Sequence, residues 1–315
     1  MLRETEWQRL LGRQWLSHMR AGDFAAAWTI NDEVIRRGWY RPSANLPRHY
    51  QVVWNGETLA GKAVRIVCHH GLGDTIQFVR YAPRVKEIAG SVTLCAQPQL
   101  LPLLRTMERS FDELLPLDDR RCDLHAAEVC VEVMELPHIF RTTLRSVPAD
   151  VPYFRVRPAR LPDRRRPNVG LVWEGSLWDP QRSIPFEFIR ALAASADVNW
   201  HVIQRGEALN DWNEAFGRNS GAENVLEAAG VIAALDLLIT IDSMPAHLAG
   251  ALGVPTWILL AADPDWRWMT QTAASPWYPT ARLFRQTQQG EWWPVIEAVT
   301  AALQDLRDIN PVVHA

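Results

Sequence analysis

Three short segments of this 315-residue sequence hold the residue types that could do chemistry, and each lies where a strand-like run meets a helical run. The first segment is residues 69–75, HHGLGDT. Gly71 and Gly73 allow the backbone to approach a ligand closely, and the start of a helix behind them favours an anion. Asp74 could accept a proton from an attacking hydroxyl, or it could cap the helix. The sequence leaves both roles open.

The same segment argues against a metal site and a dinucleotide site. His69 and His70 end a strand, so their side chains should point to opposite faces and not share one metal ion. The third glycine of a dinucleotide fingerprint is replaced by Ile76, so no nicotinamide or flavin is expected. His70 is expected to line a polar cleft or to be a buried, hydrogen-bonded histidine.

The second segment is residues 240–247, TIDSMPAH. Pro245 suits the first turn of a helix, and Asp242 or Ser243 could cap it. The free N–H groups and the positive end of the helix dipole would then form a diphosphate-type site, to which His247 could add a donor. An ordinary capped helix is the alternative.

The third segment is residues 172–185, in which Arg182 and Ser183 precede a helix. A guanidinium group there could chelate phosphate oxygens, although an ordinary surface arginine would have the same local sequence. Trp266, Trp268 and Trp277 follow a later strand, and their rings could wall a sugar or fill the core.

Strands that alternate with helices position these segments. Residues 63–96 form a strand–turn–helix–strand unit, with the helix expected over residues 75–90 and the second strand over residues 91–96. The alternation restarts at residue 168 and includes a strand expected over residues 236–242, which predicts βαβ units and parallel sheets. Residues 155–167, with six Arg and three Pro, are typical of a linker. Two such domains would place a ligand cleft at the carboxyl ends of both sheets.

A helical hairpin is expected ahead of the first domain, over residues 4–37. It is similar to half of a tetratricopeptide repeat, and a single unit is too short for a solenoid. Because it carries Trp7, Trp15 and Trp28, with Trp39 close behind, we expect it to dock on the N-terminal domain or to mediate a homodimer. The expected segments are residues 1–45 (helical), 46–158 (acceptor domain), 165–294 (nucleotide-sugar domain) and 295–310 (a helix crossing back).

Composition excludes several classes of protein. Hydrophobic residues make up 48% and charged residues 22% of the chain, which excludes a largely disordered or collagen-like protein. The net charge of -3 gives no reason to expect a nucleic-acid partner. The four Cys show no Cys-x-x-Cys spacing, and no apolar run is long enough for a signal or membrane segment, so we expect reduced thiols and a cytoplasmic protein.

Taken together, these segments resemble a known family. The stretches HGLGDTIQFVRYAP, GLVWEGS, RSIPFE, LLITIDSMPAHLAGALGVPTWILL, DWRW and SPWYPTARLFRQ look like the glycosyltransferase domain that follows tetratricopeptide repeats in bacteria. That domain is similar to the family 9 heptosyltransferases of lipopolysaccharide synthesis. The resemblance spans about residues 50–306 in order.

The resemblance implies a GT-B fold of two Rossmann-like domains and a metal-independent, inverting sugar transfer that uses a nucleoside-diphosphate sugar as substrate and no cofactor. Asp74 matches the proposed general base. The residues that match the donor-diphosphate site are Arg182, Ser183, Ser243, Met244 and His247. Those expected to line the cleft are His70, Gly71, Gly73, Gln77, Trp173, Asp242, Trp266 and Trp268.

The sequence departs from the family pattern in three places. His69 and His70 stand where relatives commonly have Glu-Gln, the loop between Trp173 and Arg182 is short, and the repeat array is nearly absent. A catalytically inactive GT-B protein that binds a nucleotide or a partner is therefore the alternative function. The donor sugar, its base, a glycan or protein acceptor, and the oligomeric state all stay open.

Overall fold

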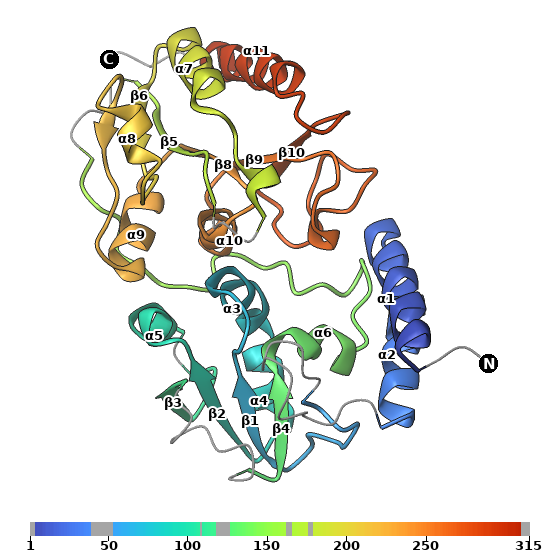
Figure 1. The fold of residues 1–315 in the computed structure, drawn as a ribbon. Coiled ribbons are helices and arrows are strands. Elements are labelled where there is room, and N and C mark those ends of the chain that lie inside the picture. The colour runs from blue at the N-terminus through green and yellow to red at the C-terminus, as the bar shows by residue number, and fades with distance from the viewer. Residues whose placement is uncertain are drawn as a thin grey trace. The chain divides into compact units, whose positions relative to one another are not determined.

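The chain folds into two compact units. A computed structural model describes the backbone of residues 4–38, 53–107, 109–117, 127–161, 166–175 and 179–309, and the side chains of these ranges except residues 4–8 and 305–309. Unit 1 comprises Met1–Phe154 with Met269–Gln271, and unit 2 comprises Arg155–Trp268 with Thr272–Ala315 (Figure 1). No helix in the described ranges is long and apolar enough to cross a membrane. The side chains of Trp7, Trp39 and Cys122 lie outside the described residues.

Unit 1 is built on a parallel four-stranded sheet with the order β3-β2-β1-β4. The central strand β1 is buried over four of its five residues, as expected where helices cover both faces of a parallel sheet. Its last residue, Val67, is paired with Cys95 on one side and Glu132 on the other. The strands are β1 (Ala63–Val67), β2 (Ser91–Ala96), β3 (Glu113–Pro116) and β4 (Val129–Glu132).

The long helix predicted over residues 75–90 is divided. It begins earlier, at Leu72, and a 3-10 turn separates its two α-helical parts, with Pro83 in the first turn of the second part. Proline suits the first turn of a helix and disfavours its interior, so the break is local in origin. The helical elements of the sheet region are α3 (Leu72–Phe78), η2 (Val79–Tyr81), α4 (Ala82–Ile88), η3 (Pro98–Leu100), α5 (Leu101–Leu104), η5 (Val133–Glu135) and α6 (Leu136–Ile139).

The N-terminal hairpin consists of α1 (Glu4–Ala21) and α2 (Phe24–Arg36) and docks within unit 1. The buried indole of Trp28 donates from Nε1 to the carbonyl oxygen of Thr142 at 2.6 Å. Asp32 Oδ1 lies 2.8 Å from His138 Nε2, and both oxygens of Asp32 accept from the Arg141 guanidinium at 2.8 Å. The expectation that the hairpin docks on the N-terminal domain is confirmed, whereas its kinship with tetratricopeptide repeats stays a prediction.

Unit 2 is built on a parallel six-stranded sheet with the order β10-β9-β8-β5-β6-β7. Its strands are β5 (Asn168–Val172), β6 (Asn199–Val202), β7 (Arg218–Asn219), β8 (Leu237–Ile241), β9 (Thr256–Leu260) and β10 (Ala281–Arg285). Its helical elements are η6 (Pro180–Arg182), α7 (Phe186–Ser195), α8 (Leu209–Trp212), α9 (Val225–Ile232), α10 (Met244–Ala251), η7 (Trp266–Trp268) and α11 (Trp293–Ile309).

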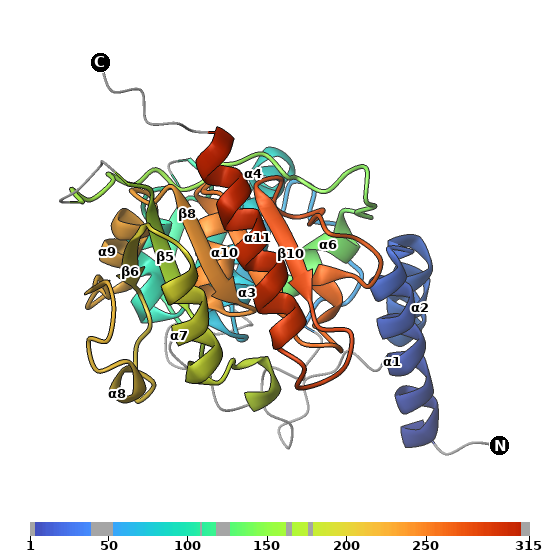
Figure 2. The same cartoon turned by 90° about the horizontal axis from the view of Figure 1, so that it is seen from above.

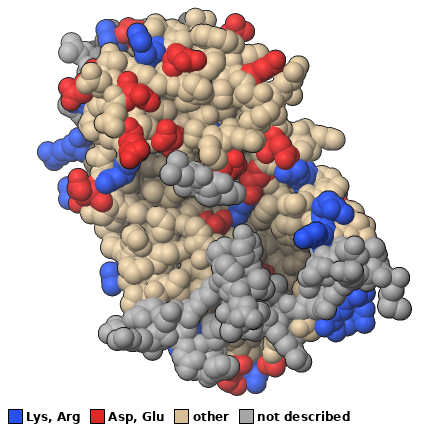
Figure 3. All heavy atoms as spheres, viewed as in Figure 1, with Lys and Arg blue, Asp and Glu red and all other residues tan. Residues whose placement is uncertain are grey.

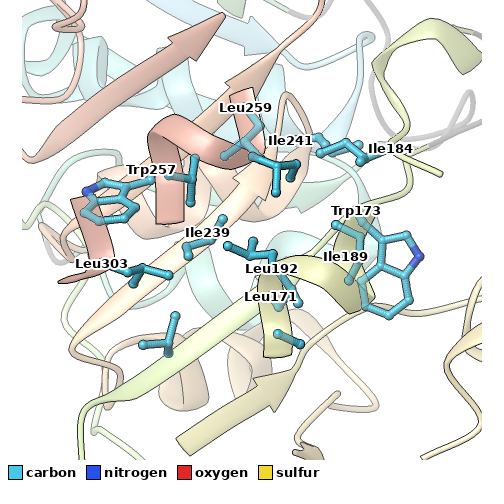
Figure 4. Close-up of a cluster of buried hydrophobic side chains, with 14 of the residues drawn as sticks. Leu171, Trp173, Ile184, Ile189, Leu192, Ile239, Ile241, Trp257, Leu259 and Leu303 are labelled. Atoms are coloured by element: carbon cyan, nitrogen blue, oxygen red, sulfur yellow. The ribbon is translucent and has the colours of Figure 1, made fainter. Parts of the chain in front are cut away.

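One large hydrophobic cluster of unit 2 lies where the helices α7 and α11 cover a face of its sheet (Figure 2). Leu171, Ile239 and Leu259 from three adjacent strands meet Leu192 of α7 and Leu303 of α11 (Figure 4). The C-terminal helix starts at residue 293 rather than 295, and its apolar face belongs to this core. Its predicted return to the N-terminal domain stays a prediction. The α/β class with two parallel sheets is confirmed.

Candidate functional site

The three segments predicted to do chemistry follow strands at which the strand order of a sheet reverses. In unit 1, β2 and β3 extend from one side of β1 while β4 lies on the other, and in unit 2, β6 and β7 extend from one side of β5 while β8 lies on the other. Parallel α/β sheets bind ligands at such reversals, outside the carboxyl ends of the strands. The turn with Asp74 follows β1, the segment with Arg182 follows β5, and the turn with Asp242 follows β8. Each unit therefore carries predicted site residues at its switch point. We call those around His70 and Asp74 the unit 1 half-site, and those around Arg182, Asp242 and His247 the unit 2 half-site.

In unit 1, Asp74 is the third residue of α3 and not its N-cap. Gly71 holds the N-cap position, and its N–H donates to Asp74 Oδ2 at 2.8 Å. A Cβ at Gly71 would lie 3.1 Å from the same oxygen, which is a tight contact. The carboxylate thus has a structural contact at the start of α3, and its role as a general base stays a prediction.

A buried glutamate missed by the sequence analysis stands beside His70. Glu132, the last residue of β4, is 1% exposed, and its Oε1 lies 2.8 Å from His70 Nδ1. Its two oxygens also accept the N–H groups of His69 at 3.2 Å and Met134 at 2.6 Å. The register that pairs Val67 with Glu132 brings this carboxylate to the first half-site, and no local sequence pattern predicts that pairing.

A second carboxylate supports the first. Glu135 accepts the backbone N–H groups of Val53 at 2.9 Å, Trp54 at 3.0 Å and Glu132 at 2.8 Å. Burial raises the pKa of Glu135 to about 7, and the charge of Glu132 adds to the rise while the backbone donors oppose it. This pair ties the end of β4 to the segment that precedes β1.

The remaining unit 1 predictions divide between the turn and the interior. Gln97 donates from Nε2 to the carbonyl oxygen of His70 at 2.6 Å and accepts from Thr75 Oγ1 at 3.0 Å, so it fixes the glycine turn. Gly73 was expected in the turn ahead of the helix and instead lies in the first turn of α3. Gln77, expected to line a cleft, has a fully buried side chain, so that prediction is wrong.

In unit 2, Arg182 joins the two strands at the switch point. Its Nη1 donates to the carbonyl oxygen of Asp242 at 2.9 Å and lies 3.8 Å from Asp242 Oδ2. Its Nε lies 3.4 Å from Asp179 Oδ2, and only 13% of its side chain is exposed. Arg182 is therefore not an ordinary surface arginine. Ser183 Oγ accepts the N–H of Gly175 at 3.3 Å and holds the same loop.

The first turn of α10 lacks the side-chain cap that the sequence predicted. Ser243 is the N-cap, but its hydroxyl donates backwards to the carbonyl oxygen of Ile241 at 3.3 Å. Pro245 stands in the first turn, as expected. The first N–H groups of an α-helix have no acceptor within the helix, and those of Ser243 and Met244 are among them in α10. This end of α10 is therefore suited to an anion.

His247 lies one turn into α10 and is 5% exposed. Its Nδ1 lies 3.0 Å from the hydroxyl of Tyr278, and its ring stacks on Trp268 with the centroids 5.4 Å apart and the planes at 22°. Its Nε2 lies 4.0 Å from Asp242 Oδ1. His247 was predicted at this site, whereas Tyr278 is distant along the chain and no local pattern predicted it.

Asp242 lies in a cluster that mixes acidic and basic side chains. Burial raises the pKa of Asp242 to about 6, the neighbouring Asp265 adds to the rise, and Arg182 and Arg267 oppose it. Arg267 Nη1 donates to Asp265 Oδ1 at 2.8 Å, and its guanidinium lies 4.8 Å above the ring of Trp266. Asp265 and Arg267 come from the chain after β9 and were also missed by the sequence analysis.

The tryptophans expected to line a substrate surface lie inside the protein. Trp173 is 1% exposed and lies in a hydrophobic cluster (Figure 4). Its ring packs against that of Phe186. Trp266, Trp268 and Trp277 are also buried, with Trp266 and Trp277 in an edge-to-face contact at 6.1 Å. The core alternative holds for these rings. Trp268 still serves the half-site, as the support beneath His247.

Local groups must supply the charge for any anionic ligand. Acidic and basic side chains are interspersed on the face of the molecule drawn in Figure 3. Within the described ranges, no group of three or more His, Cys, Asp or Glu side chains is arranged to hold a metal ion. The charged groups gathered at the unit 2 half-site are Asp179, Arg182, Asp242, Asp265 and Arg267.

Comparison with known proteins supports this geometry at the level of the fold. No protein-family model matches the sequence. The chain is 26% identical over 295 residues to protein FlbA of Caulobacter vibrioides, covering 81% of this chain and 48% of FlbA, so it spans about half the length of that relative.

Solved structures give the architecture. The chain superposes on the family 9 glycosyltransferase of Veillonella parvula with a TM-score of 0.54 and 12% identity, covering 77% of this chain and 90% of that one. With the E. coli ADP-heptose lipopolysaccharide heptosyltransferase II, the TM-score is 0.53 and the identity 16%, and the match covers 78% of this chain and 99% of that one. With the E. coli heptosyltransferase WaaC with ADP-2-deoxy-2-fluoro heptose, the TM-score is 0.53 and the identity 11%, and the match covers 77% of this chain and 99% of that one. The chain is thus similar in fold to solved family 9 glycosyltransferases and heptosyltransferases.

Proposed function

We propose that this protein is an inverting, metal-independent glycosyltransferase that moves a sugar from a nucleoside-diphosphate sugar to a hydroxyl acceptor. The observation that carries the proposal is the unit 2 switch point, where Arg182, His247 and the open end of α10 converge. The likeness in fold to solved heptosyltransferases supports it.

The unit 2 half-site would bind the donor diphosphate. Negative charge grows on the leaving nucleoside diphosphate as the bond from the anomeric carbon to the phosphate oxygen breaks. The Arg182 guanidinium, the N–H groups of Ser243 and Met244, and His247 Nε2–H are the groups proposed to stabilise that charge. Such charge-assisted hydrogen bonds would do the work that other transferases assign to a metal ion.

The unit 1 half-site would serve the acceptor. In the proposed reaction the acceptor oxygen forms a bond to the anomeric carbon from the side opposite the leaving phosphate, which inverts the configuration. Asp74 takes the hydroxyl proton, and the nucleoside diphosphate leaves with the bonding electrons. His70, which is backed by Glu132, is the proposed cleft residue next to Asp74.

One observation favours a second candidate function. The hydrogen bond from Gly71 N–H to Asp74 Oδ2 accounts for an aspartate at this position without any catalysis. A GT-B protein that binds a nucleotide but transfers no sugar would have the same contact. The two candidates agree on nucleotide binding and differ in turnover.

Calorimetric titration tests the part that both candidates share. ADP is the first ligand to test, because one solved neighbour is named an ADP-heptose heptosyltransferase and another was solved with ADP-2-deoxy-2-fluoro heptose; UDP, GDP and CDP follow. Arg182→Ala should weaken binding of the diphosphate by about 1 to 3 kcal/mol and leave nucleoside binding almost unchanged, since it removes a charge-assisted bond.

The matched control is Arg190→Ala, which removes an exposed arginine from α7 in the same unit. It should leave the affinity unchanged. Equal losses for nucleoside and nucleoside diphosphate in the Arg182 variant would place this arginine away from the phosphates. Failure of the wild-type protein to bind any nucleoside diphosphate would refute the proposed donor site.

A further inference from the structure

The donor half-site contains one group whose hydrogen-bonding role is not fixed by its chemistry. A neutral imidazole has one N–H and one bare nitrogen, so it can offer a phosphate oxygen either a donor or a lone pair. Phosphate oxygens accept hydrogen bonds, and His247 helps to bind them only if the hydrogen is on the nitrogen that faces the ligand. The surroundings of the ring determine which nitrogen that is.

The two nitrogens of His247 face different partners. Nε2 points towards the carboxylate of Asp242, 4.0 Å from Oδ1, and that carboxylate is itself buried. A lone pair on Nε2 would repel this oxygen in a low-dielectric setting, whereas an N–H would be attracted to it. The hydrogen therefore belongs on Nε2.

The other nitrogen then has to accept. The hydroxyl of Tyr278 lies 3.0 Å from Nδ1, and a tyrosine hydroxyl can donate. The Tyr278 side chain is fully buried, so bulk water does not compete for its hydroxyl. With the hydrogen on Nε2, Nδ1 is the acceptor of this contact and the Tyr278 hydroxyl is its donor.

Packing keeps the imidazole in this orientation. Trp268, fully buried, stacks on one face of the ring with the planes 22° apart. Gly250, one turn after His247, makes room for the tyrosine, because a Cβ there would lie 2.4 Å from atoms of the Tyr278 ring. Tyrosine, tryptophan and glycine together leave the histidine little freedom to rotate.

We propose that Tyr278 is a positioning residue of the donor half-site: its hydroxyl donates to His247 Nδ1 and holds the imidazole as the tautomer whose Nε2–H is offered to the donor diphosphate. The inference rests on the proposed function for its ligand. The tautomer itself follows from the contacts within unit 2.

The first test is nuclear magnetic resonance of the ring nitrogens in protein labelled with ¹⁵N-histidine, with His247 assigned by the signal that disappears in His247→Ala. The wild-type protein should show a neutral ring with its hydrogen on Nε2. Tyr278→Phe should shift the Nδ1 resonance towards that of a nitrogen that accepts no hydrogen bond. A wild-type ring that carries its hydrogen on Nδ1, or on both nitrogens, overturns the inference.

The second test is calorimetric titration with ADP. Tyr278→Phe should weaken ADP binding about 3- to 10-fold, the effect of losing one neutral hydrogen bond, and should leave adenosine binding unchanged. Tyr81→Phe is the matched control: it removes an equally buried hydroxyl, 2.8 Å from Thr142 Oγ1 in unit 1, and should leave ADP binding unchanged. Equal effects of the two variants would overturn the inference.

His247→Ala separates this inference from the proposed function. If His247→Ala weakens ADP binding and Tyr278→Phe does not, the positioning role of Tyr278 is wrong while the donor site stands. If the wild-type protein binds no nucleoside diphosphate, the proposed donor site falls. If His247→Ala has no effect on binding, the assignment of His247 to the diphosphate falls, and the role of Tyr278 in offering Nε2–H falls with it. The ring-nitrogen shifts still report the tautomer in that case.

Discussion

Glu135 should make the stability of unit 1 depend on pH in a direction opposite to that of an ordinary surface glutamate. Its pKa is raised from 4.5 to about 7, first by burial. Between these two values the folded protein binds more protons than the unfolded chain, so the free energy of unfolding falls as the pH rises through this window. The perturbation is Glu135→Gln, which is neutral at every pH.

The magnitude follows from the shift. A rise from 4.5 to about 7 corresponds to about 3 kcal/mol for the fully ionised group at 1.36 kcal/mol per pH unit. Between pH 5.5 and pH 8, about 2 kcal/mol of this destabilisation should develop in the wild-type protein. Glu135→Gln also loses an acceptor oxygen, but that loss does not vary with pH, so the difference in slope is the quantity to measure.

The assay is urea unfolding at pH 5.5 and pH 8, followed by circular dichroism and tryptophan fluorescence. Glu128→Gln is the matched control, because Glu128 also accepts a backbone N–H, that of Ala63, but is exposed and has a lowered pKa. Because the pKa of Glu128 is below its ordinary value, this carboxylate is ionised in both the folded and the unfolded protein above pH 5.5. Glu128→Gln should therefore show the same change in the free energy of unfolding between pH 5.5 and pH 8 as the wild-type protein. An unchanged slope in Glu135→Gln would refute the argument.

Two further changes test the packing of the hairpin and of the Tyr278 ring. Trp28→Ala removes a 4% exposed indole that anchors the hairpin and should cost about 3 to 5 kcal/mol, whereas Trp293→Ala, 53% exposed, should cost about 1 kcal/mol or less; equal losses in thermal unfolding would contradict the docking of the hairpin. Gly250→Ala places a Cβ 2.4 Å from the Tyr278 ring and should destabilise by about 1 to 3 kcal/mol, whereas Gly12→Ala, with no atom within 4 Å, should stabilise slightly; a neutral Gly250→Ala would show that the tyrosine ring can move.

The sequence predicted those elements whose pattern is local. The apolar runs of β2 and β8 lie within one residue of their expected bounds, since a strand of a parallel sheet buried on both faces is a continuous hydrophobic run. β7 (Arg218–Asn219) was not predicted, because both residues are exposed and the strand exists only through backbone pairing with β6. Pro83 divided a helix whose apolar spacing looked continuous.

The site was predictable where one turn carries it and not where tertiary pairing does. The turns with Asp74 and Asp242 have recognisable glycine or proline signals next to a strand. Glu132 reached the first half-site through strand register, and Tyr278 reached His247 through the packing of distant segments. Trp173 was misassigned because an aromatic ring near a predicted site is as readily a core residue as a binding surface.

Catalysis by Asp74 is the central claim, and its most direct test is the release of nucleoside diphosphate from a sugar nucleotide and acceptor pair by Asp74→Asn. The asparagine keeps an oxygen for the Gly71 N–H, so the start of α3 should survive while the base is lost. Asp112→Asn is the control, since Asp112 is a 45% exposed aspartate of the same unit that pairs with Lys86.

We expect Asp74→Asn to bind ADP as the wild-type protein does and to turn over at least on the order of a hundredfold more slowly, while Asp112→Asn retains activity. Turnover by Asp74→Asn at the wild-type rate would contradict the assignment of Asp74 as the base. Absence of turnover in the wild-type protein, across a panel of sugar nucleotides that it binds, would instead favour the inactive binding protein.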